Sequence, residues 1–282
     1  MSREHSPTVR RRRLASELRR HRERAHLTID DVALRLECSA SKISRIETGR
    51  VGVNPRDVRD LMALYGAEAD EVDAFVQLAR EARRKAWWHS YQAVFTGSFV
   101  GLESEAARLW AYQALLVPGL LQTADYMRAV FRAARPASTP TEIDMRVAGR
   151  LKRQQLLIDN DPPTYWAVMD EAVLFRPVGG PAVMRDQFAR MLELAALPNM
   201  TLQIIPFSAG AHAGMDGPFL IMGFPELTDS DVVYVDSIAD GVYLEDQEDV
   251  NRYTLMFDHL RAAALSPEAT LDRISQAANR GA

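Results

Sequence analysis

The chain has 282 residues, 47% of them hydrophobic and 26% charged, and a formal net charge of −4. This length predicts two domains rather than one, and no stretch approaches the roughly 20 apolar residues that a membrane span needs. The arginine-rich start lacks the apolar run of a signal peptide, and a single cysteine, Cys38, excludes an internal disulfide framework. We therefore expect a cytoplasmic protein without a membrane partner.

The charge is divided unevenly along the chain. Residues 1–60 carry fifteen Lys and Arg against nine Asp and Glu, a balance of +6, so the remainder carries −10. A basic segment joined to an acidic body is typical of a nucleic-acid-binding module attached to a sensing or assembly domain. The alternative is that the basic residues form an ordinary solvated tail.

The basic segment is expected to begin with an amphipathic helix, after a flexible N-terminus at residues 1–9. Leu14 and Leu18 recur at helical spacing among arginines from there onward. Thr28 is the expected N-cap of a second helix, because Asp31 stands three residues later in a capping-box relation.

A third helix is predicted in the stretch SASKISRIETGR, residues 39–50. The preceding turn is so short that this helix must lie across the second one. Ser39 is the expected N-cap, and Gly49 provides the left-handed residue that ends the helix. The side expected to be buried consists of Ala40, Ile43 and Ile46.

Two further helical patterns complete a five-helix domain at residues 10–85. One has Asn54 as its N-cap and Pro55 in its first turn, and the last runs from about residue 71 to residue 85. Five short helices with a tight turn between the second and third describe a helix-turn-helix domain.

The outward side of the third helix suits the major groove of DNA. Small residues such as Ala40 and Ser41 let the start of a helix approach the base edges closely. Ser41 can hydrogen-bond to a base, and Arg45, one turn later, can form a forked contact with guanine N7 and O6. Since a short helix reads only a few base pairs, we expect a homodimer on a palindromic site in double-stranded DNA.

The flanks of this helix suit contacts with phosphates, which position a protein without specifying sequence. We expect Lys42, Ser44 and Arg50 to contact phosphates, together with the amide groups where the Thr28 helix starts. Glu47 would repel a phosphate, so we expect it to accept hydrogen bonds from a neighbouring arginine or loop amide.

The segment LTIDDVALRLECSASKISRIETGR resembles the xenobiotic-response-element type of helix-turn-helix, the group that contains the phage repressors and Cro. The resemblance covers roughly residues 10–85. It implies that Ala40 also contacts a base, through its methyl group.

Beyond a junction at residues 86–102, which includes Trp87 and Trp88, we expect an α+β domain at residues 103–282. We expect helices first, including one from about residue 103 to residue 114, and then a mostly antiparallel sheet. The predicted strands are TYWAVMD, TLQIIPF, GPFLIMGF, DVVYVDS and GVYLED. A helix at 184–197 separates the first two strands, and helices at 248–264 and 267–279 close the chain.

Several phrases of this domain resemble the domain that follows the helix-turn-helix in many actinobacterial regulators, sometimes described as antitoxin-like. They are VPGLLQTADYMRA, MDEAVLFRPVGG, PNMTLQIIPFSAGAHAGMDGPFLIMGF, VVYVDS and YLED. The resemblance covers roughly residues 85–280. It implies a small partner protein encoded nearby.

Polar residues at the predicted strand ends offer a second kind of site. Glu171, His212 and Asp236 are our candidates for a small-molecule pocket. With Asp170 and Asp216 they also contain the carboxylates and the histidine of an acid–base or metal site, but no catalytic, nucleotide-binding or metal motif accompanies them. We therefore expect no enzyme, no cofactor and no metal.

These observations together predict a sequence-specific DNA-binding regulator of transcription. Its C-terminal domain would dimerise and sense a ligand or a protein partner. The alternative is a DNA-binding antitoxin-like protein that sequesters a small neighbouring protein.

Overall fold

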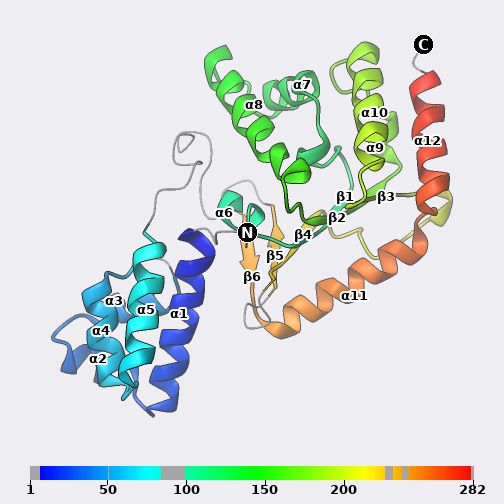
Figure 1. Ribbon diagram of the computed structural model, residues 1–282. Helices are drawn as coiled ribbons and strands as arrows, with labels where there is room; N and C mark the ends of the chain where they lie inside the picture. The colour runs from blue at the N-terminus through cyan, green and yellow to red at the C-terminus, as the bar shows by residue number, and fades with distance from the viewer. Residues whose placement is uncertain (1–6, 50, 84–98, 226–230, 237–240, 281–282) are drawn as a thin grey trace. The chain divides into compact units, whose positions relative to one another are not determined.

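The computed structural model describes residues 7–49, 51–83, 99–225, 231–236 and 241–280 (Figure 1). The chain divides into two compact units, residues 1–90 and residues 91–282. Some predictions fall on residues outside this description. They are positions 1–6 of the expected flexible N-terminus, Arg50, residues 84–85 at the end of the expected five-helix domain, residues 86–98 of the expected junction with Trp87 and Trp88, and residue 237 at the end of the predicted strand DVVYVDS.

The first unit is helical throughout its regular structure. Its helices are α1 (Pro7–Arg24), α2 (Ile29–Arg35), α3 (Ala40–Glu47), α4 (Pro55–Leu64) and α5 (Ala69–Glu81). Each segment that the sequence predicts as a helix in this unit is helical, and α1 begins at Pro7, inside the expected flexible tail.

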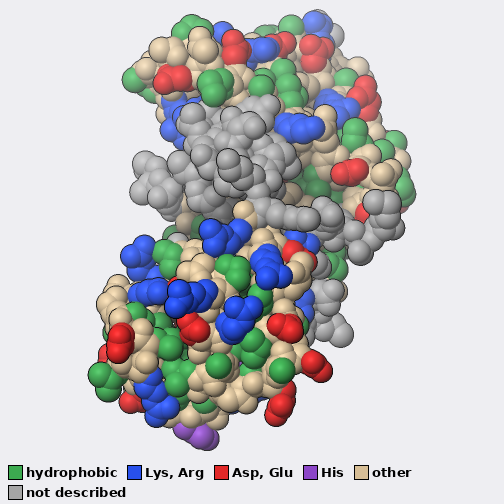
Figure 2. Space-filling view, turned by 60° about the vertical axis from the view of Figure 1, so that its left-hand side comes forward, with side chains coloured by type: hydrophobic (Ala, Val, Ile, Leu, Met, Phe, Trp, Pro, Cys, Tyr) green, Lys and Arg blue, Asp and Glu red, His purple; other side chains and the backbone are tan. Residues whose placement is uncertain are grey.

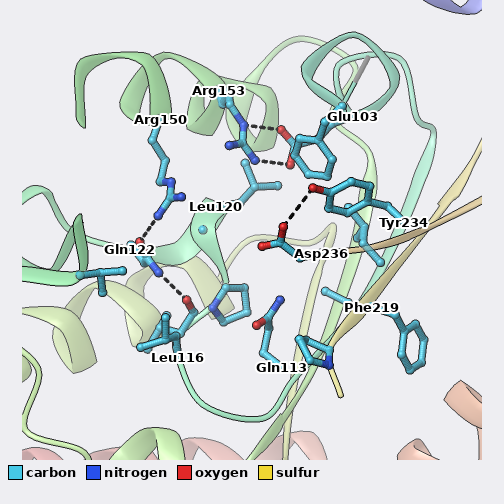
Figure 3. A pocket seen from close by; sticks show the side chains of 18 of the residues that line it. Glu103, Gln113, Leu116, Leu120, Gln122, Arg150, Arg153, Phe219, Tyr234 and Asp236 are labelled. Carbon is cyan, nitrogen blue, oxygen red and sulfur yellow. Dashed lines mark hydrogen bonds and ion pairs between the residues drawn. The ribbon is translucent and has the colours of Figure 1, made fainter. Parts of the chain in front are cut away.

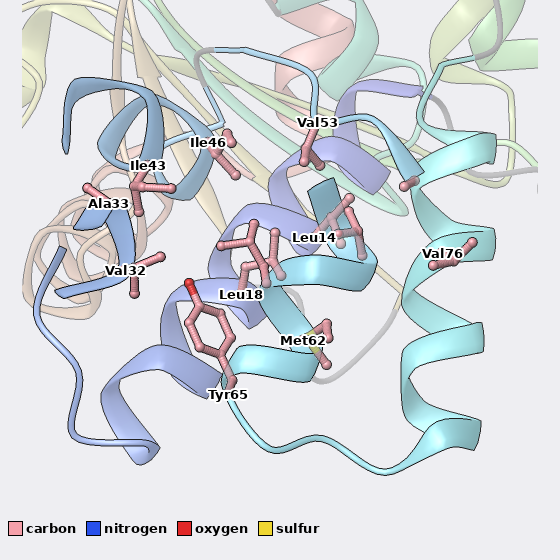
Figure 4. Packing of buried hydrophobic residues seen from close by; sticks show 13 residues of the cluster. Leu14, Leu18, Val32, Ala33, Ile43, Ile46, Val53, Met62, Tyr65 and Val76 are labelled. Atoms are coloured by element: carbon pink, nitrogen blue, oxygen red, sulfur yellow. The ribbon is translucent and has the colours of Figure 1, made fainter. Parts of the chain in front are cut away.

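One apolar core joins these helices, as Figure 4 shows. Leu18 of α1, Val32 of α2 and Met62 of α4 are fully buried in it. Ile43 and Ile46 of α3 are only 1% and 3% exposed, so their predicted burial is confirmed, whereas Ala40 is only partly buried. Burial of this apolar surface fixes which side of α3 faces outward.

The helix ends follow the predicted caps. The Thr28 hydroxyl accepts a hydrogen bond from the Asp31 amide, and the Ser39 hydroxyl accepts one from the Lys42 amide. The Asn54 side chain caps α4, whose first residue is Pro55. The expected left-handed conformation at Gly49 is also confirmed, with φ of 64°.

The turn between α2 and α3 contains a left-handed residue that the sequence does not predict. Glu37 has φ of 50°, a left-handed conformation without a glycine, and the Cys38 amide donates to the Ala33 carbonyl over 2.9 Å. This closed turn brings α3 across α2 within a few residues.

The second unit contains a mixed six-stranded sheet in its described residues. Its strands are β1 (Arg108–Gln113), β2 (Thr164–Asp170), β3 (Met200–Ile205), β4 (Phe219–Gly223), β5 (Val232–Val235) and β6 (Val242–Leu244), and their order is β3-β2-β1-β4-β5-β6. The pairs β1–β2 and β2–β3 are parallel, whereas β1–β4, β4–β5 and β5–β6 are antiparallel.

Two expectations for this unit are wrong. The sheet is mixed rather than mostly antiparallel, and β1 stands where we expected a helix over residues 103–114. The segments that join the parallel strands contain helices, as parallel crossovers usually require. They are α7 (Ala124–Ala134) and α8 (Pro140–Gln154) between β1 and β2, and α9 (Ala172–Phe175) and α10 (Pro181–Ala195) between β2 and β3.

The helices lie on both faces of the sheet. In Figure 1, α11 (Gln247–Ala263) runs along one side, and α7, α8, α9 and α10 lie on the other. Trp110 of β1 stacks on Phe257 of α11, with ring centroids 5.4 Å apart. Because side chains alternate along a strand, Ala111 and Gln113 of β1 face the helices on the other side. The C-terminal helix α12 (Pro267–Arg280) packs against α10 and β3.

Candidate DNA-binding face and ligand pocket

The outward side of α3 is polar and accessible. Ser41, Lys42 and Arg45 are exposed, and Ala40 and Ser44 are partly buried. Figure 2 shows Lys and Arg side chains gathered on the visible surface of the first unit. The predicted base-reading and phosphate-contacting residues of α3 therefore share one short helix with an accessible face.

Two cations of α3 differ in their surroundings. The Lys42 ammonium lies 3.0 Å from a carboxylate oxygen of Asp57 on α4. Among the described residues, the Arg45 side chain forms no ion pair and no hydrogen bond. Arg45 can therefore turn its guanidinium toward a ligand without breaking a contact with the described residues, whereas Lys42 must exchange one.

The carboxylate of Asp31 already accepts hydrogen bonds at the N-terminus of α2. The Thr28 amide and hydroxyl both donate to Asp31 Oδ2, over 2.9 Å and 2.6 Å. These bonds hold the pKa of Asp31 below its ordinary value, the hydroxyl contributing most. The Thr28 side chain is thus committed to the helix cap and would have to be released to meet a phosphate.

A buried ion pair anchors α3 to α1. Arg22 Nε and Nη2 donate to the two carboxylate oxygens of Glu47 over 2.8 Å and 2.9 Å, and Nη1 donates to the Leu27 carbonyl. The hydrogen bond to Glu47 raises the pKa of Arg22. This contact confirms the structural role expected of Glu47.

A cavity of about 410 Å³ lies in the second unit, within the size range of small-molecule sites. Its floor is the face of the sheet opposite α11, where Ala111, Gln113, Tyr165 and Tyr234 point. The loop 116–122 and side chains from α6 (Phe99–Glu103), α7 and α8 form its walls. We call this cavity the sheet pocket (Figure 3).

The three residues predicted for a pocket do not meet in one. Asp236 lines the sheet pocket, but Glu171 and His212 do not. Glu171 is 1% exposed, pairs with Arg273 of α12 and accepts from the Phe207 amide over 2.8 Å. His212 Nε2 lies 3.4 Å from Asp170 Oδ2. Glu171 is thus occupied by α12 and His212 by Asp170, and the sequence reveals neither contact.

Two charged side chains of the sheet pocket, Arg150 and Arg153, come from α8 (Figure 3). Arg153 Nε and Nη2 donate to the two Glu103 oxygens over 2.6 Å and 2.7 Å. Arg150 Nη1 donates to Gln122 Oε1 over 2.6 Å. Burial lowers the pKa of Arg150 to about 9, so this group is still cationic at neutral pH.

An oxygen-rich edge lies across the pocket from α8. The Tyr234 hydroxyl lies 3.2 Å from Asp236 Oδ1 and donates to it. Burial, with the Asp236 charge adding to it, raises the pKa of Tyr234 and keeps its hydroxyl protonated. The described residues hold no group of three or more His, Cys, Asp or Glu arranged to hold a metal ion.

Each of the two units matches a known protein family. Residues 13–75 match a family described as a helix-turn-helix domain, and residues 96–276 match one described as a domain of unknown function, DUF5753. The chain belongs to the DUF5753 family. In this chain the DUF5753 domain follows a helix-turn-helix, which supports a DNA-binding regulator.

The comparisons give the DUF5753 domain no ligand or partner. No curated protein and no solved structure matches the chain. Among the described residues, no helix combines the length and the apolar character needed to cross a bilayer.

Proposed function

We propose that this protein is a sequence-specific regulator of transcription that binds double-stranded DNA through α3. The observation that carries the proposal is the two-sided character of this helix, whose isoleucines are buried and whose Ser41 and Arg45 are exposed one turn apart. Such a helix can enter the major groove with Ala40, Ser41 and Arg45 toward the base edges.

Phosphate contacts on the flanks would set the orientation of α3. Lys42 and Ser44 border the exposed face, and Arg50 follows the helix in the sequence. Lys42 exchanges Asp57 for a phosphate when DNA binds, so part of its contribution is offset by the pair that it gives up. The salt dependence of binding would report this exchange.

The DUF5753 domain would pair two copies of the chain and respond to a signal. A cavity the size of a small-molecule site favours a small molecule as that signal. An antitoxin-like role rests on the resemblance alone. We propose a cytoplasmic homodimer on a palindromic operator, with no catalytic step and no cofactor.

Selection of genomic fragments by the full-length protein tests this proposal. The wild-type chain should enrich fragments that share one motif, because Ser41 and Arg45 discriminate between bases. A chain carrying Ser41→Ala and Arg45→Ala should lose that enrichment, whereas Arg80→Ala on the exposed side of α5 should keep it. Enrichment of the same fragments by the double variant would contradict the proposal.

A further inference from the structure

Arg150 lines the sheet pocket and contacts only neutral groups among the described residues. Among the described residues, its guanidinium makes one hydrogen bond, to the neutral Gln122 amide, and no ion pair. Its Nε is buried without a partner, and its charged group lies 4.5 Å from the centroid of the Phe131 ring. Arg150 is half-buried, and a cation that is partly removed from water with only neutral contacts is costly to keep.

The neighbouring charges do not supply the missing anion. Glu103 is occupied by the forked pair with Arg153, and Asp236 accepts from Tyr234. Of the described residues, three arginines, Arg135, Arg150 and Arg153, line the pocket together with the two carboxylates of Glu103 and Asp236. One positive charge is left over, which suits a ligand with a single negative charge better than a dianion.

The wall beside Arg150 is held rigid by buried amides. Gln122 Nε2 donates to the Val117 carbonyl over 2.6 Å, and Gln154 Nε2 donates to the Gln122 carbonyl over 2.7 Å. Gln187 Nε2 donates to the Leu121 carbonyl over 2.7 Å. These three side chains hold the loop 116–122 in one conformation. Ligand binding therefore does not have to order this loop, which lowers the entropic cost of binding.

The remaining lining is largely apolar. Leu116, Leu120, Val130, Phe131 and Leu220 contribute to it, and Ala111 leaves room above the sheet. Carbon atoms therefore surround a site with one uncompensated cation. This combination selects a molecule with an acidic end and an apolar body.

We propose that the sheet pocket binds a small organic acid whose single carboxylate pairs with Arg150 and whose apolar body lies on the sheet. This inference deepens the sensing role in the proposed function, and the binding itself is tested without DNA. A guanidinium forms two parallel hydrogen bonds with a carboxylate, as Arg153 does with Glu103.

Calorimetric titration of the full-length protein tests the site directly. The probes are phenylacetate, octanoate, their neutral amides and phenyl phosphate. At least one acid should bind, and its amide should bind about tenfold or more weakly because it lacks the charge. Phenyl phosphate distinguishes a general oxyanion site from the monoanion site proposed here, and tighter binding of it than of either acid would overturn the proposal.

Three variants test whether acid binding depends on Arg150. Arg150→Met keeps the aliphatic stem and should abolish the response to the acid. Gln113→Glu, almost unchanged in shape, adds a negative charge to the pocket and should weaken the acid but not the amide. Arg185→Met, on the exposed side of α10, is the matched control and should bind the acid as the wild type does.

A thermal melt distinguishes this role from a purely structural one. Without added acid, Arg150→Met should melt at the same temperature as the wild type or higher, since a half-buried charge without an ion pair is removed. A large fall in melting temperature, together with no response of the wild type to any acid, would overturn the proposal. Equal binding of acid and amide, or an acid response kept in Arg150→Met, would overturn it too.

The effect of a bound acid on DNA affinity is measured in a second experiment. An acid that binds the wild type and changes its affinity for a selected genomic fragment supports both the site and the sensing role. An acid that binds but leaves DNA affinity unchanged supports the site and contradicts the sensing role.

Discussion

The uncommitted guanidinium of Arg45 is the group on which base recognition depends most. We expect Arg45→Ala to cost about 1 to 3 kcal/mol at the preferred DNA site and to relax the choice of base at one position. Lys42→Ala should instead weaken all sequences alike and lower the salt slope by about one, since it removes a phosphate contact. Fluorescence anisotropy across a salt series measures both quantities.

Arg80→Ala on α5 controls for a general loss of positive charge. It should change affinity far less than Arg45→Ala and leave base preference as it is. Unchanged affinity and unchanged base preference in Arg45→Ala would show that another group reads the base. Ser41 would then be the next candidate for the residue that reads the base.

Contacts between elements decide whether α3 is held in place, and the pair between Arg22 of α1 and Glu47 of α3 is the main polar one. These side chains are 11% and 4% exposed, whereas those of the surface pair Arg19 and Glu23 are 61% and 50% exposed. Glu47→Gln should therefore lower the free energy of unfolding by about 3 to 5 kcal/mol, because Arg22 keeps a buried charge without its anion.

Arg19→Ala is the matched comparison and should cost only about 0.2 to 1 kcal/mol. Urea unfolding followed by circular dichroism measures both variants. If the two substitutions cost the same, the Arg22–Glu47 pair does not hold α3 more firmly than a surface pair does. Sequence-specific DNA binding by Glu47→Gln should fall with the loss of α3 packing.

Local signals in the sequence predict the first unit well and the second less completely. Caps such as Thr28, Ser39 and Asn54 act within one helical turn, so a single sequence contains all the information that they need. Strand β1 was missed because it is central and has buried residues on both faces, so its residues do not alternate clearly, and the helix-favouring stretch ESEAA precedes it. The parallel pairing of β1 with β2 was lost with it.

The sheet pocket was beyond sequence analysis for a related reason. It combines β1 and the loop 116–122 that follows it with α8 and β5, which lie far along the chain. One signal was available: Arg150 falls on the stripe of α8 that buries Ile143, Val147 and Gln154. A charged residue at a buried helical position indicates a partner or a ligand more strongly than the strand-end residues Glu171 and His212 do.

The arrangement of two chains on DNA gives a prediction that depends on the complete protein. If the DUF5753 domain pairs two copies, two α3 helices should read half-sites about 34 Å apart, on one face of the duplex. Inserting five base pairs between the half-sites of a selected operator turns one of them by about half a helical turn, away from the other. Affinity should then fall to roughly that of a single half-site.

An insertion of ten base pairs is the control, because it returns both half-sites to the same face of the duplex. It should recover part of the affinity if the link between the units permits the longer span. Sedimentation of the protein with the unaltered operator should show two chains per duplex. Equal affinity for the five- and ten-base-pair insertions, with one chain bound per half-site independently, would contradict a dimer. Base reading by Arg45 would still be open to its own test, because each α3 contacts its half-site separately.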